Sequence, residues 1–252
     1  MTRTPRLPYL TVLGCLSFAL TACATEDNPM NISAVADATR PAADRTRDDD
    51  RKPAKMLAFA RVMPGETVVD FLPGKGYFTR LFSTAVGPAG TVYAVTPQLF
   101  VDTHKGATLP SIAGESGHGN VHDVTAANGT LGLATPADLV WTSQNYHDVH
   151  VWGGPDAAAQ LNKAVFEALK PGGLYVILDH AGPVGLDEAG IKKLHRIDEA
   201  TVIREVEAAG FEADGASTVL RNPADPHTVA VFDPSIRGKT DQFLLRFRKP
   251  RR

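Results

Sequence analysis

The sequence predicts an α/β protein built on a doubly wound, mostly parallel sheet of seven strands that ends in an antiparallel hairpin. Three observations support this fold class. Short apolar strands alternate with amphipathic helices through the first two thirds of the domain, a glycine turn joins the first strand to its helix, and two strands near the chain end flank a long connection. Such alternation is typical of a parallel sheet with helices on both faces.

Seven runs of β-branched and apolar residues are the predicted strands: 67–72, 91–95, 120–124, 138–142, 174–178, 217–220 and 242–247. Helical spacing of apolar residues predicts helices at 53–63, 77–86, 156–169 and 187–209. Pro53 suits the first turn of a helix, and Gly210 suits a helix end. Turns at 87–90 and 170–173, each with a proline and two glycines, separate helices from the strands that follow. The fourth and fifth strands are nearly continuous in apolar character, as expected in a buried parallel sheet.

Composition narrows the functional classes. The 252 residues are 43% hydrophobic and 21% charged, as in an ordinary globular protein, and the net charge of −2 argues against a nucleic-acid surface. The only cysteines are Cys15 and Cys23, so the folded part is expected to have neither a disulfide nor a cysteine metal site.

The first 22 residues are predicted to be a signal peptide. Arg3 and Arg6 precede a short apolar stretch that ends Leu-Thr-Ala-Cys at Cys23, a pattern that resembles a bacterial lipobox. The resemblance implies lipidation of Cys23 and an exported, periplasmic protein anchored to the outer membrane, since Ala24 is not the aspartate that retains lipoproteins at the inner membrane. The alternative is an ordinary signal peptide cut near the same place.

Residues 23–52 are predicted to be a lipidated N-terminus followed by a flexible linker. They are rich in Ala, Thr, Asp and Arg and contain almost no large apolar side chains, so we expect no buried core there. Residues 53–252 have the size of one domain.

Residues 67–79 carry the most informative motif. A strand with Asp70 near its end runs into a turn with Gly74 and Gly76, and a helix follows, an order suited to nucleotide binding because glycine lets a ligand approach the backbone. Thr79 replaces the third glycine of the dinucleotide fingerprint. An acidic strand end followed by Gly-x-Gly resembles motif I of class I S-adenosylmethionine-dependent methyltransferases.

Other segments strengthen this resemblance across most of 53–250. Residues 90–95 resemble the second strand of that family, 138–141 its motif IV strand, and 169–173 the turn before its fifth strand. The resemblance implies a Rossmann-like methyltransferase fold, S-adenosylmethionine as cofactor and a small-molecule methyl acceptor. No protein partner is evident.

The resemblance also implies which residues bind the cofactor, namely Asp70, Pro73, Gly74, Gly76, Thr96, Gln98 and Asp123. Two of these positions depart from the family pattern. Thr96 stands where the family has an acidic residue for the ribose hydroxyls, and it or Gln98 would bond the ribose less strongly than a carboxylate. Pro73 removes one backbone N–H from the glycine turn.

Polar residues follow the fourth and fifth predicted strands. Carboxyl ends of parallel strands meet at one edge of a sheet, where ligands bind. We expect His147 to act as a base or orienting group, with Asp148 or Asp179 holding its ring and Asn145 and Tyr146 beside the acceptor. The expected gathering also includes His180, and His195 with Asp198 on the last long helix.

Several alternatives remain open. The histidines could be satisfied structural residues, and His147, Asp148, His150, Asp179 and His180 offer enough donors for one divalent ion. Their spacing matches no specific metal motif, and the prediction is no metal site.

The long connection 221–241 is either an ordered loop that covers a site or a solvated excursion. The predicted function is an exported, membrane-anchored methyltransferase. A non-catalytic periplasmic binding protein with a repurposed pocket is the alternative, because S-adenosylmethionine is made in the cytoplasm.

Overall fold

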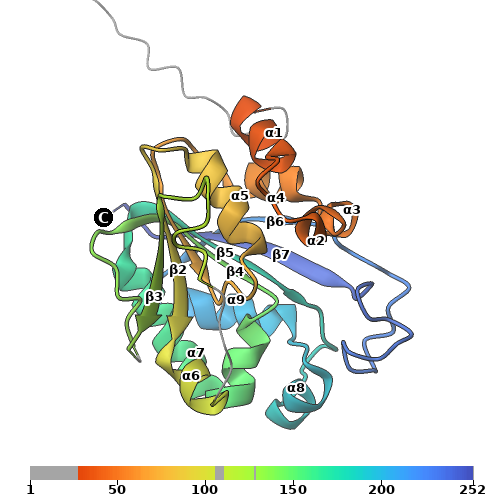
Figure 1. Ribbon diagram of the computed structural model, residues 1–252. Helices are drawn as coiled ribbons and strands as arrows, with labels where there is room; N and C mark the ends of the chain where they lie inside the picture. Colours follow the sequence, from red (N-terminus) through yellow and green to blue (C-terminus); the bar gives the residue numbers. More distant parts are fainter. Residues whose placement is uncertain (1–27, 106–110, 128, 252) are drawn as a thin grey trace, which may run out of the picture.

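The computed structural model describes residues 28–105, 111–127 and 129–251. The strands are β1 (Thr67–Phe71), β2 (Thr91–Pro97), β3 (Val121–Ala126), β4 (Ala137–Ser143), β5 (Leu169–His180), β6 (Glu212–Ser217) and β7 (Gln242–Arg248). They form a seven-stranded sheet in the order β3-β2-β1-β4-β5-β7-β6 (Figure 1). Strands β1 to β5 are parallel, and β7 is antiparallel to both β5 and β6. The predicted fold class is confirmed.

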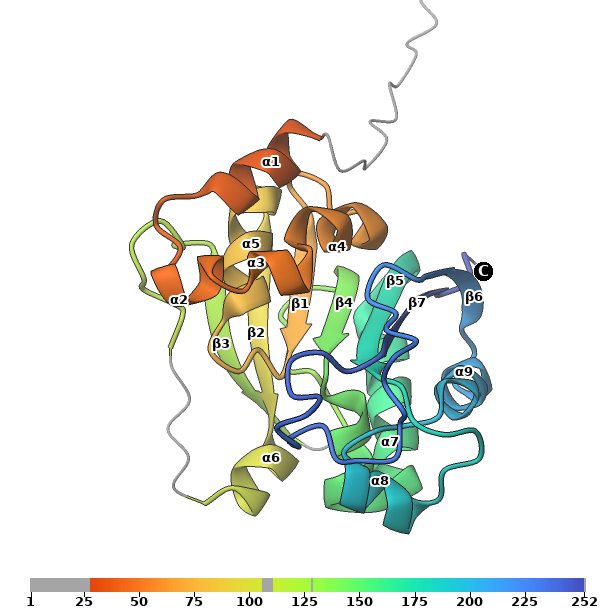
Figure 2. The same cartoon turned by 90° about the vertical axis from the view of Figure 1, so that its right-hand side faces the viewer.

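The helices are α1 (Pro29–Ala36), α2 (Ala42–Arg45), α3 (Asp48–Arg51), α4 (Pro53–Ala60), α5 (Tyr77–Val86), α6 (Gln98–Thr103), α7 (Tyr146–Ala168), α8 (Glu188–Leu194) and α9 (Glu199–Ala208). Helices α1, α4 and α5 cover one face of the sheet, and α6 to α9 lie on the other (Figures 1 and 2). Among the described residues, no helix is both long and apolar enough to cross a membrane.

Alternating side chains of the strands supply both cores. Val68 packs into the core under α5, and its neighbour Val69 packs into the core under α7. Trp141 of β4 is fully buried, with its ring 4.7 Å from that of Phe78 and 5.7 Å from that of Phe82. These contacts hold the start of α5, and therefore the glycine turn before it, against the end of β4.

The flexible linker predicted before residue 53 is wrong for residues 28–52. This segment forms α1, α2 and α3, and α1 packs on α5. Ala34 of α1 belongs to the core under α5, and paired charges make further contacts. Arg40, which is 1% exposed, binds Asp48 at 2.6 Å, and Asp44 binds Arg80 of α5 at 2.9 Å. The signal peptide and Cys23 lie outside the described residues.

The single helix predicted at 187–209 is also wrong. It breaks into α8 and α9 because His195 ends α8 in the left-handed conformation, at φ 52°, and the side chain of Asp198 caps α9. The buried Arg196 between them pairs with Asp225. Helix periodicity alone hides such a break, since the apolar residues on both sides keep the same spacing.

Three other boundaries differ from the prediction. Strand β5 begins at Leu169 rather than at Leu174, so the turn predicted at 170–173 lies within it. Helix α7 begins at Tyr146, ten residues before the predicted start at Asp156, and bends at Gly154, whose φ is 67°. The sixth strand is Glu212–Ser217 rather than 217–220, and most of its residues are exposed at the sheet edge. Its weak apolar pattern explains the shifted prediction.

Candidate functional site

A cavity lies at the centre of the carboxyl edge of the sheet. The strand order places a topological switch point between β1 and β4, and ligands of such sheets bind beyond the strand ends at this point. The cavity has a volume of about 230 Å³. Asp70, Pro73 and Gly74 line it from the β1 side, and Gln144 and Asn145 line it from the β4 side.

Asp70 is the acidic group of this cavity. It is 2% exposed, and its Oδ2 accepts a hydrogen bond of 2.6 Å from the Thr79 hydroxyl of α5. Burial raises the pKa of Asp70 to about 7, against the opposing effect of the Thr79 bond. The carboxyl group is therefore close to half ionised at neutral pH, and a cation placed against it would stabilise the ionised form.

The two glycines of the turn have different roles. Both have positive φ, 56° at Gly74 and 80° at Gly76. A Cβ atom on Gly74 would meet nothing within 4 Å, whereas one on Gly76 would lie 2.3 Å from Cδ1 of Ile112. Gly74 therefore leaves the cavity open. Gly76, which is predicted to bind the cofactor, makes room for Ile112.

Two strand ends at the cavity have strained backbones. Leu72 and Gln144 are not glycines, yet their φ values are 57° and 61°. The amide of Asn145 donates a hydrogen bond of 3.0 Å to the Leu72 carbonyl, which links the two strand ends. Such strained positions cluster at functional sites, and both of these line the cavity.

Arg51 brings a positive charge into the cavity from the N-terminal segment. Its guanidinium lies 4.7 Å from the Tyr77 ring centre and donates a hydrogen bond of 3.2 Å to Gln144. Burial, with repulsion from Arg47, lowers the pKa of Arg51 to about 10. The group still carries its charge at neutral pH, beside the carboxyl group of Asp70.

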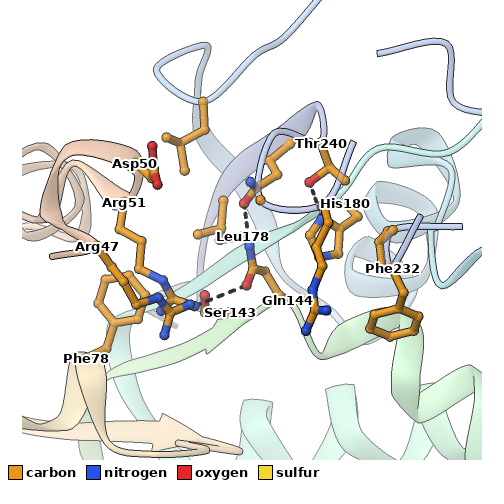
Figure 3. Close-up of a pocket in the computed structure, with 15 residues that line it drawn as sticks. Arg47, Asp50, Arg51, Phe78, Ser143, Gln144, Leu178, His180, Phe232 and Thr240 are labelled. Atoms are coloured by element: carbon orange, nitrogen blue, oxygen red, sulfur yellow. Dashed lines mark hydrogen bonds between the residues drawn. The ribbon is translucent and has the colours of Figure 1, made fainter. Parts of the chain in front are cut away.

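A second cavity of about 340 Å³ adjoins the first, because Arg47, Arg51, Phe78, Ser143 and Gln144 line both. Figure 3 shows Arg47 and Arg51 on one side of it and His180 and Phe232 on the other. Gln144 lies between them and donates a hydrogen bond of 2.9 Å to Gln242.

The long loop 221–241 forms the outer wall of this second cavity. Val231, Phe232, Arg237 and Thr240 line it. Of the two predictions for this segment, the structure therefore supports an ordered loop that covers a cavity. The buried pair between Arg196 and Asp225 ties the loop to the α8–α9 turn.

Four predicted cofactor residues do not line the cavity at Gly74: Gly76, Thr96, Gln98 and Asp123. Thr96 is 6% exposed within β2. The amide of Gln98 donates to Asp102 at 2.9 Å. Asp123 accepts from the backbone N–H of Ala113 at 3.2 Å and from the Ser111 hydroxyl, and so supports the loop that carries Ile112.

An apolar crevice of about 170 Å³ lies beside these strand ends, on the α7 side of the sheet. It is lined by Phe71 of β1, by Pro97 and Leu99 after β2, and by Trp152 of α7. Its size and apolar walls suit a flat ring.

His147 lies behind the second cavity, at the start of α7, and is 2% exposed. Its Nδ1 is 2.7 Å from Asp179 Oδ1, its backbone N–H donates to Asp179 Oδ2 at 2.8 Å, and its Nε2 is 3.3 Å from Asp148 Oδ1. Although burial alone would lower it, the two carboxylates raise the pKa of His147 to about 10. To act as a base or as a metal ligand, Nε2 of this ring would first have to lose its proton. Asp179 holds the ring, as predicted.

Tyr146 and His150 belong to a different network. The Tyr146 hydroxyl donates to Glu205 of α9 at 2.8 Å, and His150 lies between Glu188 and Glu205 at 2.8 and 3.1 Å. Of the predicted catalytic residues, only Asn145 therefore lines the central cavity.

His180 and His195 do gather near His147, with ring centres 5.7 and 5.6 Å from it. Burial lowers the pKa of His180 to about 4, although Asp179 opposes this shift. The side chain of Asp198 turns away to cap α9, so it does not share the site.

Sequence reasoning missed the contribution of the N-terminal segment. Arg47 and Arg51 line both cavities but lie in a stretch predicted to be a linker. The available signal was local: Asn28-Pro29 is a helix start, and arginines alternate with aspartates after it.

Comparison with known proteins supports the fold. No protein-family profile matches the chain. A curated protein-L-isoaspartate O-methyltransferase from Aeropyrum pernix is 31% identical over 139 residues, which are 54% of this chain and 45% of that protein. The chain thus matches less than half the length of this relative.

Solved structures match over more of the chain. A SAM-dependent methyltransferase from Aquifex aeolicus has a TM-score of 0.56 at 18% identity, covering 86% of this chain and 97% of that one. A putative sarcosine dimethylglycine methyltransferase from Galdieria sulphuraria has a TM-score of 0.53 at 15% identity, covering 82% and 85%. The CcbJ methyltransferase from Streptomyces caelestis has a TM-score of 0.52 at 15% identity, covering 80% and 90%. The chain therefore has the fold of the class I S-adenosylmethionine-dependent methyltransferases.

Proposed function

We propose that this protein is an S-adenosylmethionine-dependent methyltransferase that acts on a small acceptor carrying an anionic group. The observation that carries the proposal is the cavity at the switch point between β1 and β4, with the buried Asp70 and the open face of Gly74 in its wall. The methyltransferase fold and the named relative support the same reaction class.

The residues around this cavity fit the proposed cofactor. The carboxylate of Asp70 suits the cofactor ammonium group, and the guanidinium of Arg51 suits its carboxylate. The apolar crevice lined by Pro97 and Trp152 suits the adenine ring. When bound, S-adenosylmethionine supplies the methyl group on a sulfonium, which is a good leaving group.

The contribution of the protein is then mainly positioning. The two adjoining cavities would hold cofactor and acceptor side by side, so that the reacting atoms meet in line. Gln144, which lies in both linings, would orient the acceptor between Arg51 and Gln242. No residue needs to act as a base if the acceptor atom is already an anionic oxygen.

Titration of S-adenosylhomocysteine into the purified full-length chain tests the cofactor proposal. We expect micromolar binding that weakens at least about 10-fold in Asp70→Asn, because a charge-assisted bond contributes about 1.5–3 kcal/mol. Only the ionised carboxylate pairs with an ammonium group, so wild-type affinity should increase as pH rises through about 7, and the variant should lose this dependence. Calorimetry at pH 6 and pH 8 measures both effects.

Asp138→Asn is the matched control, because Asp138 lies at the opposite end of β4 and pairs with Lys170. It should bind like wild type. The fold raises the pKa of Asp70 from 3.8 to about 7, so ionisation of Asp70 destabilises the folded state as pH rises. At pH 8, Asp70→Asn should therefore unfold at no lower temperature than wild type. Absence of binding by wild type at millimolar ligand would contradict the proposal and favour a repurposed binding protein.

The charge of the second cavity supports an anionic acceptor. Besides Arg51, which the proposal assigns to the cofactor, Arg47 and Arg237 line it, and Asp50 is the one carboxylate among its lining residues. None of the three arginines forms an ion pair with a carboxylate among the residues the structure describes. Phe78 and Phe232 add apolar walls. The relative from Aeropyrum pernix is named for methylation of isoaspartate, which carries a carboxylate.

Arg237→Gln tests this acceptor class. Among small acceptors offered as carboxylates and as matched amides, only carboxylates should be methylated, and the variant should raise their KM by about 10-fold or more. Lys239→Gln is the control, since Lys239 is exposed on the same loop but does not line the cavity. Equal methylation of the amides would exclude an anionic acceptor.

We also propose that the protein is exported and anchored by a lipid at Cys23. This proposal rests only on the sequence that precedes Cys23. Growth with a labelled fatty acid should label the protein, and Cys23→Ala should remove the label. An unlabelled wild-type protein would contradict the anchor.

A further inference from the structure

Three donor atoms converge where α7 begins, beside the turn between α8 and α9. Asp148 Oδ1 lies 3.3 Å from Nε2 of His147 and 3.1 Å from Nδ1 of His195, and one ligand atom of each residue lies within 4.8 Å of the other two. A metal ion bonded to nitrogen and oxygen at about 2.0–2.2 Å holds adjacent ligands about 3.0–3.5 Å apart. The two shorter separations match this spacing.

Asp179 supports His147 in the way that hydrogen-bonded carboxylates support metal-bound histidines. Asp179, fully buried, accepts a hydrogen bond from Nδ1 of His147 at 2.7 Å and another from its backbone N–H at 2.8 Å. A carboxylate on one ring nitrogen fixes the ring and directs the other nitrogen, here Nε2, toward an ion. Nε2 faces Asp148.

His195 is held toward the same point by its backbone. It ends α8 with φ 52°, an uncommon conformation for a residue other than glycine, and its ring packs 4.9 Å from the ring of Phe232. Residues 147–148 and 195 are far apart in sequence and come together only through this turn. The side chains of Asp148 and His195 are 22% and 27% exposed, so solvent can reach the point between them.

We propose that His147, Asp148 and His195 form a binding site for one divalent transition-metal ion. Two imidazoles and one carboxylate suit zinc, iron or manganese rather than calcium or magnesium, which prefer oxygen ligands. Three protein ligands leave a coordination position open to a water or substrate oxygen. The site adjoins the second cavity, because Phe232 and His180 line that cavity and lie against His195 and His147. This inference goes beyond methyl transfer and does not depend on it.

A hydrogen-bonded network without metal is the competing account of the same atoms. A proton on Nε2 would join His147 to Asp148, and a second would join His195 to Asp148. The two accounts differ in what a metal ion does to the protein, so zinc binding separates them.

The test uses the purified full-length chain without a histidine tag, stripped with a chelator and titrated with Zn²⁺ by calorimetry. We expect one ion per chain with a Kd below about 1 µM, and a higher unfolding temperature with zinc. His195→Gln and Asp148→Asn should each weaken binding at least about 100-fold, since loss of even an outer-shell partner costs about 10–100-fold. With Co²⁺, the visible absorption of the bound ion should disappear in His195→Gln.

His227→Gln is the matched control. His227 is partly exposed and pairs with Asp241 at 3.0 Å on the neighbouring loop. Among the residues the structure describes, no third histidine, cysteine or carboxylate lies close enough to complete a metal site with them. It should leave the zinc affinity unchanged. Metal-free His195→Gln should unfold like metal-free wild type, which separates loss of a ligand from loss of the fold. Failure of wild type to bind zinc, or binding that His195→Gln leaves unchanged, would overturn the proposal.

Discussion

Replacing Arg196 with methionine is expected to lower the free energy of unfolding by about 3–5 kcal/mol, because it leaves a buried carboxylate without its partner. Both side chains of the Arg196–Asp225 pair are 0% exposed. The guanidinium makes two bonds to Asp225, at 2.8 and 3.0 Å, and others to the carbonyls of Ala181 and Val229. Denaturant titration monitored by circular dichroism measures the loss.

The same change should disturb the second cavity, since Asp225 anchors the loop that carries Phe232 and Arg237. Arg204→Met is the control: Arg204 is exposed on α9, and its change should alter stability by no more than about 0.5 kcal/mol. Changing Arg196 and Asp225 together to apolar residues should recover part of the loss, because no unpaired charge remains. A loss below about 1 kcal/mol for Arg196→Met would show that the buried pair does not hold the loop.

Replacing Arg80 with methionine is expected to release the N-terminal segment from the domain. Arg80 is 5% exposed and binds Asp44 at 2.9 Å and Glu115 at 2.7 Å. Its removal leaves Asp44, itself 6% exposed, without a partner, at a cost of about 3–5 kcal/mol. Amide hydrogen exchange should then be faster across residues 28–52 than across the sheet.

Release of this segment should also weaken ligand binding, because Arg47 and Arg51 would leave both cavities. We expect at least a 10-fold loss of S-adenosylhomocysteine affinity, as for loss of one charge-assisted bond, about 1.5–3 kcal/mol. Arg61→Met serves as control, because it removes an exposed ion pair with Asp214 at 3.4 Å. It should change the free energy of unfolding by only about 0–1 kcal/mol. Unchanged exchange in residues 28–52 of Arg80→Met would mean that other contacts hold the segment.

Much of the fold followed from local patterns. The helix predicted at 77–86 is α5 with the same bounds, and the predicted strands at 67–72 and 91–95 lie within a residue or two of β1 and β2. Apolar periodicity predicts such elements because burial of one face is a property of neighbouring residues. It fails at His195, where a capped break lies between two segments that share one apolar spacing.

The candidate site could be predicted only in part. Asp70 and Gly74 were predictable because a motif encodes them within a few residues. Arg51 was not, because its place beside Gln144 joins residues 93 positions apart, and a polar segment gives no sign of the charges that it will meet. For the same reason the sequence predicts Tyr146 beside the acceptor, whereas in the structure its hydroxyl is bonded to Glu205.

The sequence by itself thus determined the sheet, the glycine turn and the edge at which the proposed cavity lies, since each depends on local apolar patterning and on residues close together in the chain. Only the tertiary structure decided which charged and polar side chains meet there: Arg51 with Gln144, His147 with Asp179, and Asp148 with His195. Hydrogen bonds and ion pairs act over about 3–4 Å. Their partners therefore depend on how distant segments pack together, which no local pattern specifies.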